Sequence, residues 1–178
     1  PTRWSFGVLR NTRNQFTKLG VQKRAGQRGA RKPVRNDLIC LLGLDFKYTG
    51  NSRYLFEQMI QDPAYAAYDI KFLTHDELVP EIHRMAPGLP ESHELVARAK
   101  MVIAESWIPP RFEKHSDSVW VQLWHGTPLK RMLFDAPEGE IQRRKPKNKI
   151  EKYRDIQRWD YLLADCDEAM GLFETAFL

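Results

Sequence analysis

The 178-residue sequence contains no apolar run of the roughly 18 to 20 residues that a membrane-spanning helix requires, and no pattern typical of a cleavable signal peptide. Walker-type loops, GxGxxG fingerprints and nucleophilic serine or cysteine arrangements are also missing. The only two cysteines, Cys40 and Cys166, form no CxxC pair and have no histidine nearby at metal-ligand spacing. We interpret both as reduced and structural, as is typical of cytosolic proteins. We therefore expect a chain that neither spans a bilayer nor carries an export address, and that has no metal site.

The composition is that of a folding chain, because hydrophobic residues make up 42% of it and charged residues 29%. With 10 glycines and 11 prolines, it matches neither a disordered tail, a collagen-like fibre nor a coiled coil. A chain of this length buries very roughly 70% of the surface that its unfolded form exposes. We therefore expect one compact domain of ordinary size.

Charge is distributed unevenly along the chain, whose net charge is +5. Residues 1–36 hold ten lysines and arginines and no acidic residue, whereas residues 37–178 hold 18 basic and 23 acidic residues. We therefore expect a basic leader or linker over 1–36, flexible after about residue 20, ahead of a folded domain over 37–178. The apolar residues among its arginines favour an anionic membrane surface, where each basic residue contributes about 1 kcal/mol. A solvated tether is the alternative interpretation.

The pattern of residues 37–178 alternates between strand-like and helix-like segments. Short apolar runs predict parallel strands at residues 38–42, 69–73, 101–104, 119–124 and 161–164. Helical spacing predicts helices at 51–61, 91–100 and 168–177, and a proline-rich segment predicts irregular structure at 80–90. We expect Asn51 or Ser52 to cap the first helix, and Asp165 or Asp167 the last. The alternation predicts an α/β fold with a doubly wound parallel sheet.

The segment 122–131 carries most of the chemistry, because a predicted strand ends there at His125. Ligands of doubly wound sheets bind beyond the carboxyl ends of the strands. Gly126 lets the backbone turn and approach such a ligand closely. An imidazole in this place suits proton abstraction from a hydroxyl next to a phosphoryl centre. A histidine at a strand end is also commonly a hydrogen-bonded structural group, and spacing alone leaves both interpretations open.

The residues that follow predict a helix start that favours an anion. Thr127 is a good N-cap, and Pro128 fits the first helical position, where its missing N–H costs nothing. The free N–H groups of such a helix start, with Lys130 and Arg131 one turn further on, would attract phosphate.

Residues 124–130, with the sequence WHGTPLK, resemble the signature of the CDP-glycerol:poly(glycerophosphate) glycerophosphotransferases. These are bacterial enzymes that polymerise teichoic acids and related capsule polymers. Three further segments resemble the same family in the expected order: GNSRYLFE at 50–57, the pair Ala99-Lys100, and WDYLL at 159–163. Together the four matches cover residues 37–178.

The resemblance implies a fold of the GT-B type, in which two Rossmann-like halves face each other across a cleft. This chain matches the N-terminal, acceptor-side half. The family's second essential histidine and its nucleotide-binding residues belong to the C-terminal half, which this chain lacks. We therefore expect that half as its partner, and expect the isolated chain to be inactive.

The implied reaction transfers glycerol phosphate, or ribitol phosphate in some relatives, from CDP-glycerol or CDP-ribitol to the hydroxyl end of a teichoic acid or capsule polymer. His125 is the implied general base, and no cofactor is expected beyond the donor substrate. The acceptor polymer is expected to be lipid-linked. This implies a cytoplasmic enzyme that is peripheral on the inner face of the cell membrane.

We expect the residues near this histidine to bind substrate or phosphate, namely Gly126, Thr127, Lys130, Arg131, Asp135 and Asn51. Asp135 has three open interpretations: it orients His125, binds a glycerol hydroxyl, or caps a surface element. His75 is a weaker candidate for lining the cleft.

A second basic cluster lies between residues 143 and 158. It predicts either a solvated helix face or a track that holds the phosphates of a polyanionic acceptor. Together with the leader, it supports an alternative function, a basic non-catalytic module that binds nucleic acid or an anionic membrane. The enzyme interpretation involves no nucleic acid.

Overall fold

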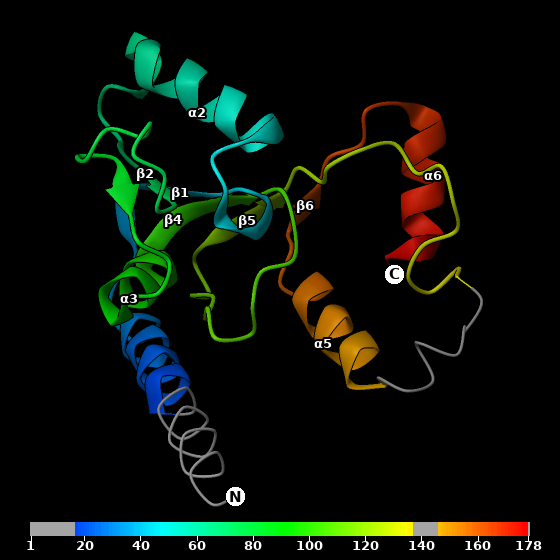
Figure 1. Ribbon diagram of the computed structural model, residues 1–178, viewed down its shortest axis with the longest axis horizontal. Helices are drawn as coiled ribbons and strands as arrows, with labels where there is room; N and C mark the ends of the chain where they lie inside the picture. The colour runs from blue at the N-terminus through cyan, green and yellow to red at the C-terminus, as the bar shows by residue number, and fades with distance from the viewer. Residues whose placement is uncertain (1–16, 137–145, 178) are drawn as a thin grey trace, which may run out of the picture.

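The fold is built on one parallel sheet (Figure 1). A computed structural model describes residues 17–136 and 146–177. Within these residues, the strands lie in the order β3-β2-β1-β4-β5-β6, and every neighbouring pair is parallel. The strands are β1 (Arg35–Leu42), β2 (Asp69–Leu73), β3 (Arg84–Met85), β4 (Ala99–Ala104), β5 (Val119–Gln122) and β6 (Tyr161–Leu162). This order confirms the predicted doubly wound sheet, whose direction of growth reverses between β1 and β4.

Helices cover both faces of the sheet. α2 (Gly50–Gln61) lies on one face, and α3 (Pro90–Arg98) lies on the other, next to a helix over residues 17–29 (Figure 1). α5 (Pro146–Ile156) and α6 (Asp167–Ala176) lie on the β6 side (Figure 1). Two short 3-10 helices follow β1 and α2, namely η1 (Leu44–Phe46) and η2 (Pro63–Tyr65). None of the helices in the described part of the chain has both the length and the apolar character to cross a membrane.

The alternation of side chains along β1 produces two separate cores. Leu38, Cys40 and Leu42 pack on the α3 side with residues such as Val96 and Trp120. The intervening residues of β1 pack on the α2 side, in the second cluster with Phe56, Met59 and Phe72. Because both faces are covered, the strand reads as a continuous apolar run in the sequence, which is why it was predictable.

A third cluster packs α5 and α6 against the end of β5. Its buried members include Trp124, Phe173 and Phe177, and Trp107 and Trp159 pack around them. The ring centroids of Trp124 and Phe177 lie 4.7 Å apart in an edge-on arrangement. Trp124 is also the first residue of the WHGTPLK motif, so this cluster holds the start of that segment.

The helix over residues 17–29 corrects the prediction of a flexible linker after residue 20. Its buried face has helical spacing, with Gln22, Ala25, Gly26 and Gly29. A Cβ on Gly29 would lie 2.5 Å from the backbone oxygen of Glu94 in α3, so this glycine allows close packing. Glycines favour a flexible backbone in an isolated segment, but Gly26 and Gly29 lie on the packing face of this helix. The division of the chain at residue 36 stays a prediction.

Other local predictions were also wrong. The segment 80–90 contains the short strand β3 rather than only irregular structure. Neither Asp165 nor Asp167 caps α6, because the N-cap residue is Cys166, which makes no side-chain capping bond. Both cysteines are free, but Cys166 is exposed and so has no structural role in the core, whereas Cys40 is buried, and burial raises the pKa of its thiol.

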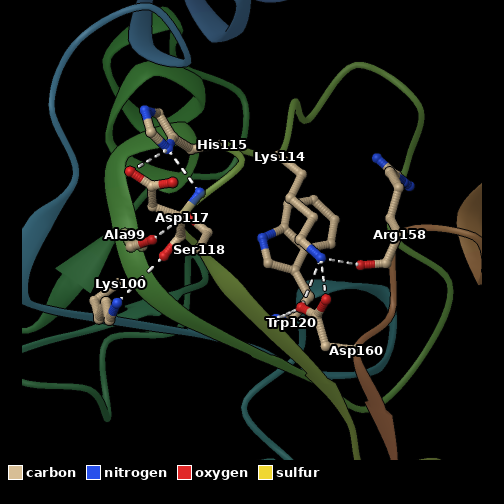
Figure 2. Close-up of polar contacts among 9 residues, drawn as sticks. All are labelled: Ala99, Lys100, Lys114, His115, Asp117, Ser118, Trp120, Arg158 and Asp160. Atoms are coloured by element: carbon tan, nitrogen blue, oxygen red, sulfur yellow. Dashed lines mark hydrogen bonds and ion pairs between the residues drawn. The ribbon is translucent and has the colours of Figure 1, made fainter.

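An ion pair between Lys114 and Asp160 fastens β6 to the sheet at its amino end (Figure 2). Lys114 Nζ lies 2.6 Å from both carboxylate oxygens of Asp160. Asp160 Oδ2 also accepts a hydrogen bond of 2.6 Å from the backbone N–H of Trp120 in β5. Because Asp160 directly precedes β6, these contacts fix the register of that two-residue strand. Asp160 belongs to the WDYLL segment, so this part of the resemblance has a structural role.

A buried neutral histidine makes the stability of the fold depend on pH. His93 of α3 is fully buried and stacks on Phe112 with ring centroids 4.0 Å apart. Neither ring nitrogen has a hydrogen-bond partner within the described residues. Burial, with a contribution from the charge of Arg111, lowers the pKa of His93 to about 4 from 6.5. Between these values the unfolded chain binds a proton that the folded chain does not, so stability is lost as pH falls.

We expect the free energy of unfolding to decrease by about 3 kcal/mol through this histidine as pH falls from about 6.5 to about 4. A His93→Phe variant keeps the stacking on Phe112 but has no titrating group. Urea unfolding across this pH range should therefore show a shallower pH dependence for the variant than for the wild-type chain. Parallel pH profiles of the two proteins would contradict the assignment.

Candidate functional site

His125 lies at the carboxyl edge of the sheet, three residues after the end of β5, and is exposed. Its Nδ1 atom is 3.0 Å from the backbone oxygen of Glu105, which follows β4. Because a carbonyl oxygen only accepts, Nδ1 carries the proton in the neutral ring, and Nε2 is left as an acceptor. Nε2 has no hydrogen-bond partner among the residues that the structure describes. The histidine is thus held at one nitrogen and available at the other.

The indole of Trp124, the residue before this histidine, packs against the imidazole ring. Trp124 is buried and has a φ of 57°, in the left-handed region that side chains rarely adopt. Its ring centroid lies 4.3 Å from that of His125. The strained backbone turns the indole into the aromatic cluster and leaves the imidazole at the surface. The sequence predicted that this strand would end at Trp124. β5 ends at Gln122 instead, because this turn interrupts the strand.

A buried carboxylate, Glu105, joins the histidine to the start of α2. Glu105 accepts hydrogen bonds from the backbone N–H groups of Asn51 and Ser52 at 2.9 and 3.1 Å, and from Ser52 Oγ at 2.7 Å. It therefore caps α2 through space, where the sequence predicted that Asn51 or Ser52 would do so. Gly50 has a φ of +69°, and a Cβ there would lie 2.0 Å from Glu105 Oε1.

Sequence reasoning missed Glu105 as a site residue. The available signal was an acidic residue placed directly after an apolar strand, at the edge where ligands bind. Its carboxylate already occupies the amino end of α2, so this helix start does not offer its N–H groups to a phosphate. The side chain of Asn51 is exposed beside it.

The helix predicted to begin at Thr127 is absent from the described structure, and residues 125–132 are irregular. Thr127 Oγ1 donates a hydrogen bond to Asp165, which follows β6, instead of capping a helix. Leu129 is 96% exposed, so its side chain contributes no burial that would stabilise a helix here. Gly126 has a φ of +153° in open space, which favours glycine in this turn.

The remaining candidates lie on both sides of this loop. Lys130 and Arg131 are exposed, near the histidine in sequence but not at a helix start. Asp135 accepts a hydrogen bond of 2.5 Å from Thr175 Oγ1 and so holds the loop against α6. His75 lines a pocket at the ends of β1 and β2.

The basic cluster between residues 143 and 158 is divided by the structure. Its members at 143–145 lie outside the described residues, as do the side chains at 147 and 149. Arg154 is exposed, and Lys152 Nζ lies 5.0 Å from the centre of the Trp107 ring. Arg158 differs from both predictions, because it donates to the backbone oxygens of Ile108 and Phe112 and pairs with the buried Asp155.

A small cavity of about 180 Å³ lies where the sheet reverses direction, between the ends of β1 and β4. Its lining includes Gly43, Asp45 and Phe46 on one side, and Ser106, next to Glu105, on the other. Asp45 and Phe46 have φ values of 52° and 60°, which place two consecutive residues in the left-handed region. Strained backbone at the reversal point of a doubly wound sheet is typical of a ligand site.

Comparison with known proteins gives the same family as the motif. The sequence model of the CDP-glycerol:poly(glycerophosphate) glycerophosphotransferases matches residues 26–178. The teichoic acid poly(glycerol phosphate) polymerase of Bacillus subtilis is 27% identical over 160 residues, which are 83% of this chain and 20% of that protein. The teichoic acid glycerol-phosphate transferase of Staphylococcus aureus is 30% identical over 81 residues, 45% of this chain and 21% of that protein. This chain thus spans about a fifth of the length of these relatives.

Solved structures confirm the fold. The wall teichoic acid polymerase TagF superposes with a TM-score of 0.79 at 22% identity, over 96% of this chain and 43% of that chain. A variant of the same polymerase gives a TM-score of 0.80. The predicted Rossmann-like, GT-B type of fold is therefore confirmed. With the family model matching residues 26–178, the chain belongs to the CDP-glycerol:poly(glycerophosphate) glycerophosphotransferase family.

Proposed function

We propose that this chain forms the acceptor-side half of an enzyme that transfers glycerol phosphate from CDP-glycerol to the hydroxyl end of a teichoic acid or capsule polymer, with His125 as the general base. Ribitol phosphate and CDP-ribitol are the alternative donor chemistry. The observation that carries the proposal is the geometry of His125, whose Nδ1 is held by Glu105 while Nε2 is available at the ligand-binding edge.

The proposed step is a substitution at phosphorus. The terminal hydroxyl of the acceptor attacks the phosphorus that bears glycerol, a new P–O bond forms, and the bond to the CMP oxygen breaks. The hydroxyl proton goes to Nε2 of His125, and CMP leaves with the electron pair. The Nδ1 hydrogen bond to the Glu105 oxygen and the Trp124 face below the ring both favour the imidazolium that results.

The proposed phosphate contacts come from the exposed loop that follows the histidine. Lys130 and Arg131 are exposed cations near the base and would hold phosphate as flexible point charges. The mobility of such side chains suits an acceptor that moves on after each addition. Gly126 and Thr127 would contribute close backbone approach. The nucleotide would be bound mainly by a second Rossmann-like half.

The test of the catalytic assignment is a transfer assay with the intact protein in which His125 is replaced by asparagine. Acceptor binding is measured in the same preparation, because a general base contributes to the rate and not to binding. A variant that binds acceptor but does not release CMP is the expected result.

We also propose that the protein is peripheral on an anionic membrane, where a lipid-linked acceptor would be met. The exposed face of the helix over residues 17–29 and the turn after it carry Lys23, Arg24 and Arg31, while the other face packs on α3. Replacing these three residues with glutamine should weaken binding to anionic vesicles about 100-fold, at about 1 kcal/mol each.

Vesicle sedimentation measures this effect, with neutral vesicles as one control. A variant with the same loss of charge elsewhere, at Arg53, Arg84 and Lys100, is the matched protein control. Equal weakening by both variants would show that only net charge matters, and would contradict a defined membrane face.

A further inference from the structure

Two adjoining pockets form a groove along the carboxyl ends of β1, β2 and β3. The larger, of about 590 Å³, is lined by the loops that follow β1, β2 and β3, and by Arg111 from the loop after β4. The second, of about 500 Å³, lies between the helix over residues 17–29 and the start of α3. The pockets share His75 and Gly88, so they are continuous. We call this feature the β1–β3 groove, formed by Lys18, Val21 and Arg111 and by residues 45–49, 74–76 and 87–90.

Arg111 is a cation of this groove that has no counter-ion among the described residues. Its Nε atom is buried without a hydrogen-bond partner, and no described carboxylate forms an ion pair with it. The guanidinium lies 5.7 Å from the centre of the Phe112 ring, and burial lowers its pKa. Removing a charge from water without pairing it is costly, so the arrangement indicates that an anion completes the site.

Further basic side chains surround the groove. Lys47 and His75 line it and are exposed, with no ion pair among the described residues. Lys18 lines the second pocket, and its Nζ would lie 3.7 Å from a Cβ on Gly88. Two acidic residues also line the groove: Asp45, which is exposed, and Asp76, whose Oδ1 accepts a hydrogen bond of 3.0 Å from the backbone of Leu78. The cations are thus spread along the groove rather than gathered at one point.

The small cavity at the reversal point adjoins the groove on the side of Glu105, whose backbone oxygen holds His125. The 180 Å³ cavity at the reversal point shares Asp45 and Phe46 with the groove, and also includes Ser106. Ser106 follows Glu105, whose backbone oxygen holds His125. A ligand chain that ends at His125 and follows the carboxyl edge of the sheet would pass this cavity before it reaches the groove.

We propose that the β1–β3 groove binds a phosphodiester segment of the polyol-phosphate acceptor, with Arg111 anchoring one phosphate and Lys47, His75 and Lys18 lying around the next units. This inference rests on the proposed function, because it assumes that the acceptor chain ends at His125. Several phosphates bound by separate cations would give the enzyme a preference for acceptors longer than one unit.

The test is calorimetric titration of the chain with a synthetic glycerol phosphate trimer, using Arg111→Gln and, as a charge-matched control, Lys100→Gln. Lys100 is exposed at the amino end of β4, away from the carboxyl ends of the strands that form the groove, and it contacts Asp117 (Figure 2). Arg111→Gln should weaken trimer binding by about 10- to 100-fold, the loss typical of a charge-assisted contact, and Lys100→Gln by less than about 2-fold. Wild-type affinity should fall steeply with salt, as for phosphate contacts in general.

A double variant, Lys47→Gln with His75→Gln, keeps the inference falsifiable if Arg111→Gln does not fold, and should weaken trimer binding by about 10-fold. Unchanged trimer affinity in Arg111→Gln or in the double variant would overturn the inference, as would a wild-type chain that binds CMP but not the trimer. His125→Asn should bind the trimer normally. If it also transfers normally, the proposed catalytic function fails while the groove stands.

Discussion

A protein in which His125 is replaced by asparagine is expected to transfer glycerol phosphate about 10²- to 10⁴-fold more slowly. The asparagine amide is able to donate to the Glu105 carbonyl in place of the Nδ1 hydrogen, so the loop should keep its position. It cannot accept a proton from the attacking hydroxyl. The rate of CMP release under saturating acceptor measures the change, and thermal unfolding checks that the fold is intact.

The matched control for this prediction is His115→Asn. His115 lies near the opposite edge of the sheet, where its Nδ1 accepts a hydrogen bond of 3.0 Å from the backbone of Asp117 (Figure 2). This variant should transfer at the wild-type rate. A His125→Asn rate within about 3-fold of the wild type would show that no general base acts at this position.

Two elements were predicted almost to the residue. The prediction for residues 69–73 coincides with β2, and the predicted helix at 51–61 differs from α2 by one residue. These elements are specified by their own apolar pattern, which local sequence displays. The position of His125 at the carboxyl edge of the sheet follows from the apolar pattern of β5, because it depends only on where that strand ends.

The errors share one physical cause, which is that contacts distant in sequence decided the local structure. The helix over residues 17–29 is held by α3, and Glu105 caps α2 from more than 50 residues away. At Thr127 the local signals for a helix start are strong, but no described residue covers Leu129, and the Thr127 hydroxyl bonds to Asp165 instead. Propensity is a weak guide where tertiary contacts compete with it.

Replacing Glu105 with alanine is expected to lower the free energy of unfolding by about 3–5 kcal/mol. Three donors from Asn51 and Ser52 would lose their acceptor inside the protein, and α2 would lose the negative charge at its amino end. Urea unfolding measures this loss. If the free energy of unfolding decreased by less than about 1 kcal/mol, water would be replacing the carboxylate, and Glu105 would not be needed to stabilise the start of α2.

The same substitution should also reduce transfer, because the backbone oxygen that holds His125 belongs to Glu105. In conditions where the variant is fully folded, we expect the transfer rate to fall by about 10-fold with little change in acceptor affinity. Ser52→Ala separates this positioning role from simple loss of stability. It removes one donor to Glu105, at a cost of about 1 kcal/mol, but leaves the carboxylate held by two backbone N–H groups. If Ser52→Ala slowed transfer as much as Glu105→Ala, the rate would depend on the stability of α2 and not on the position of His125.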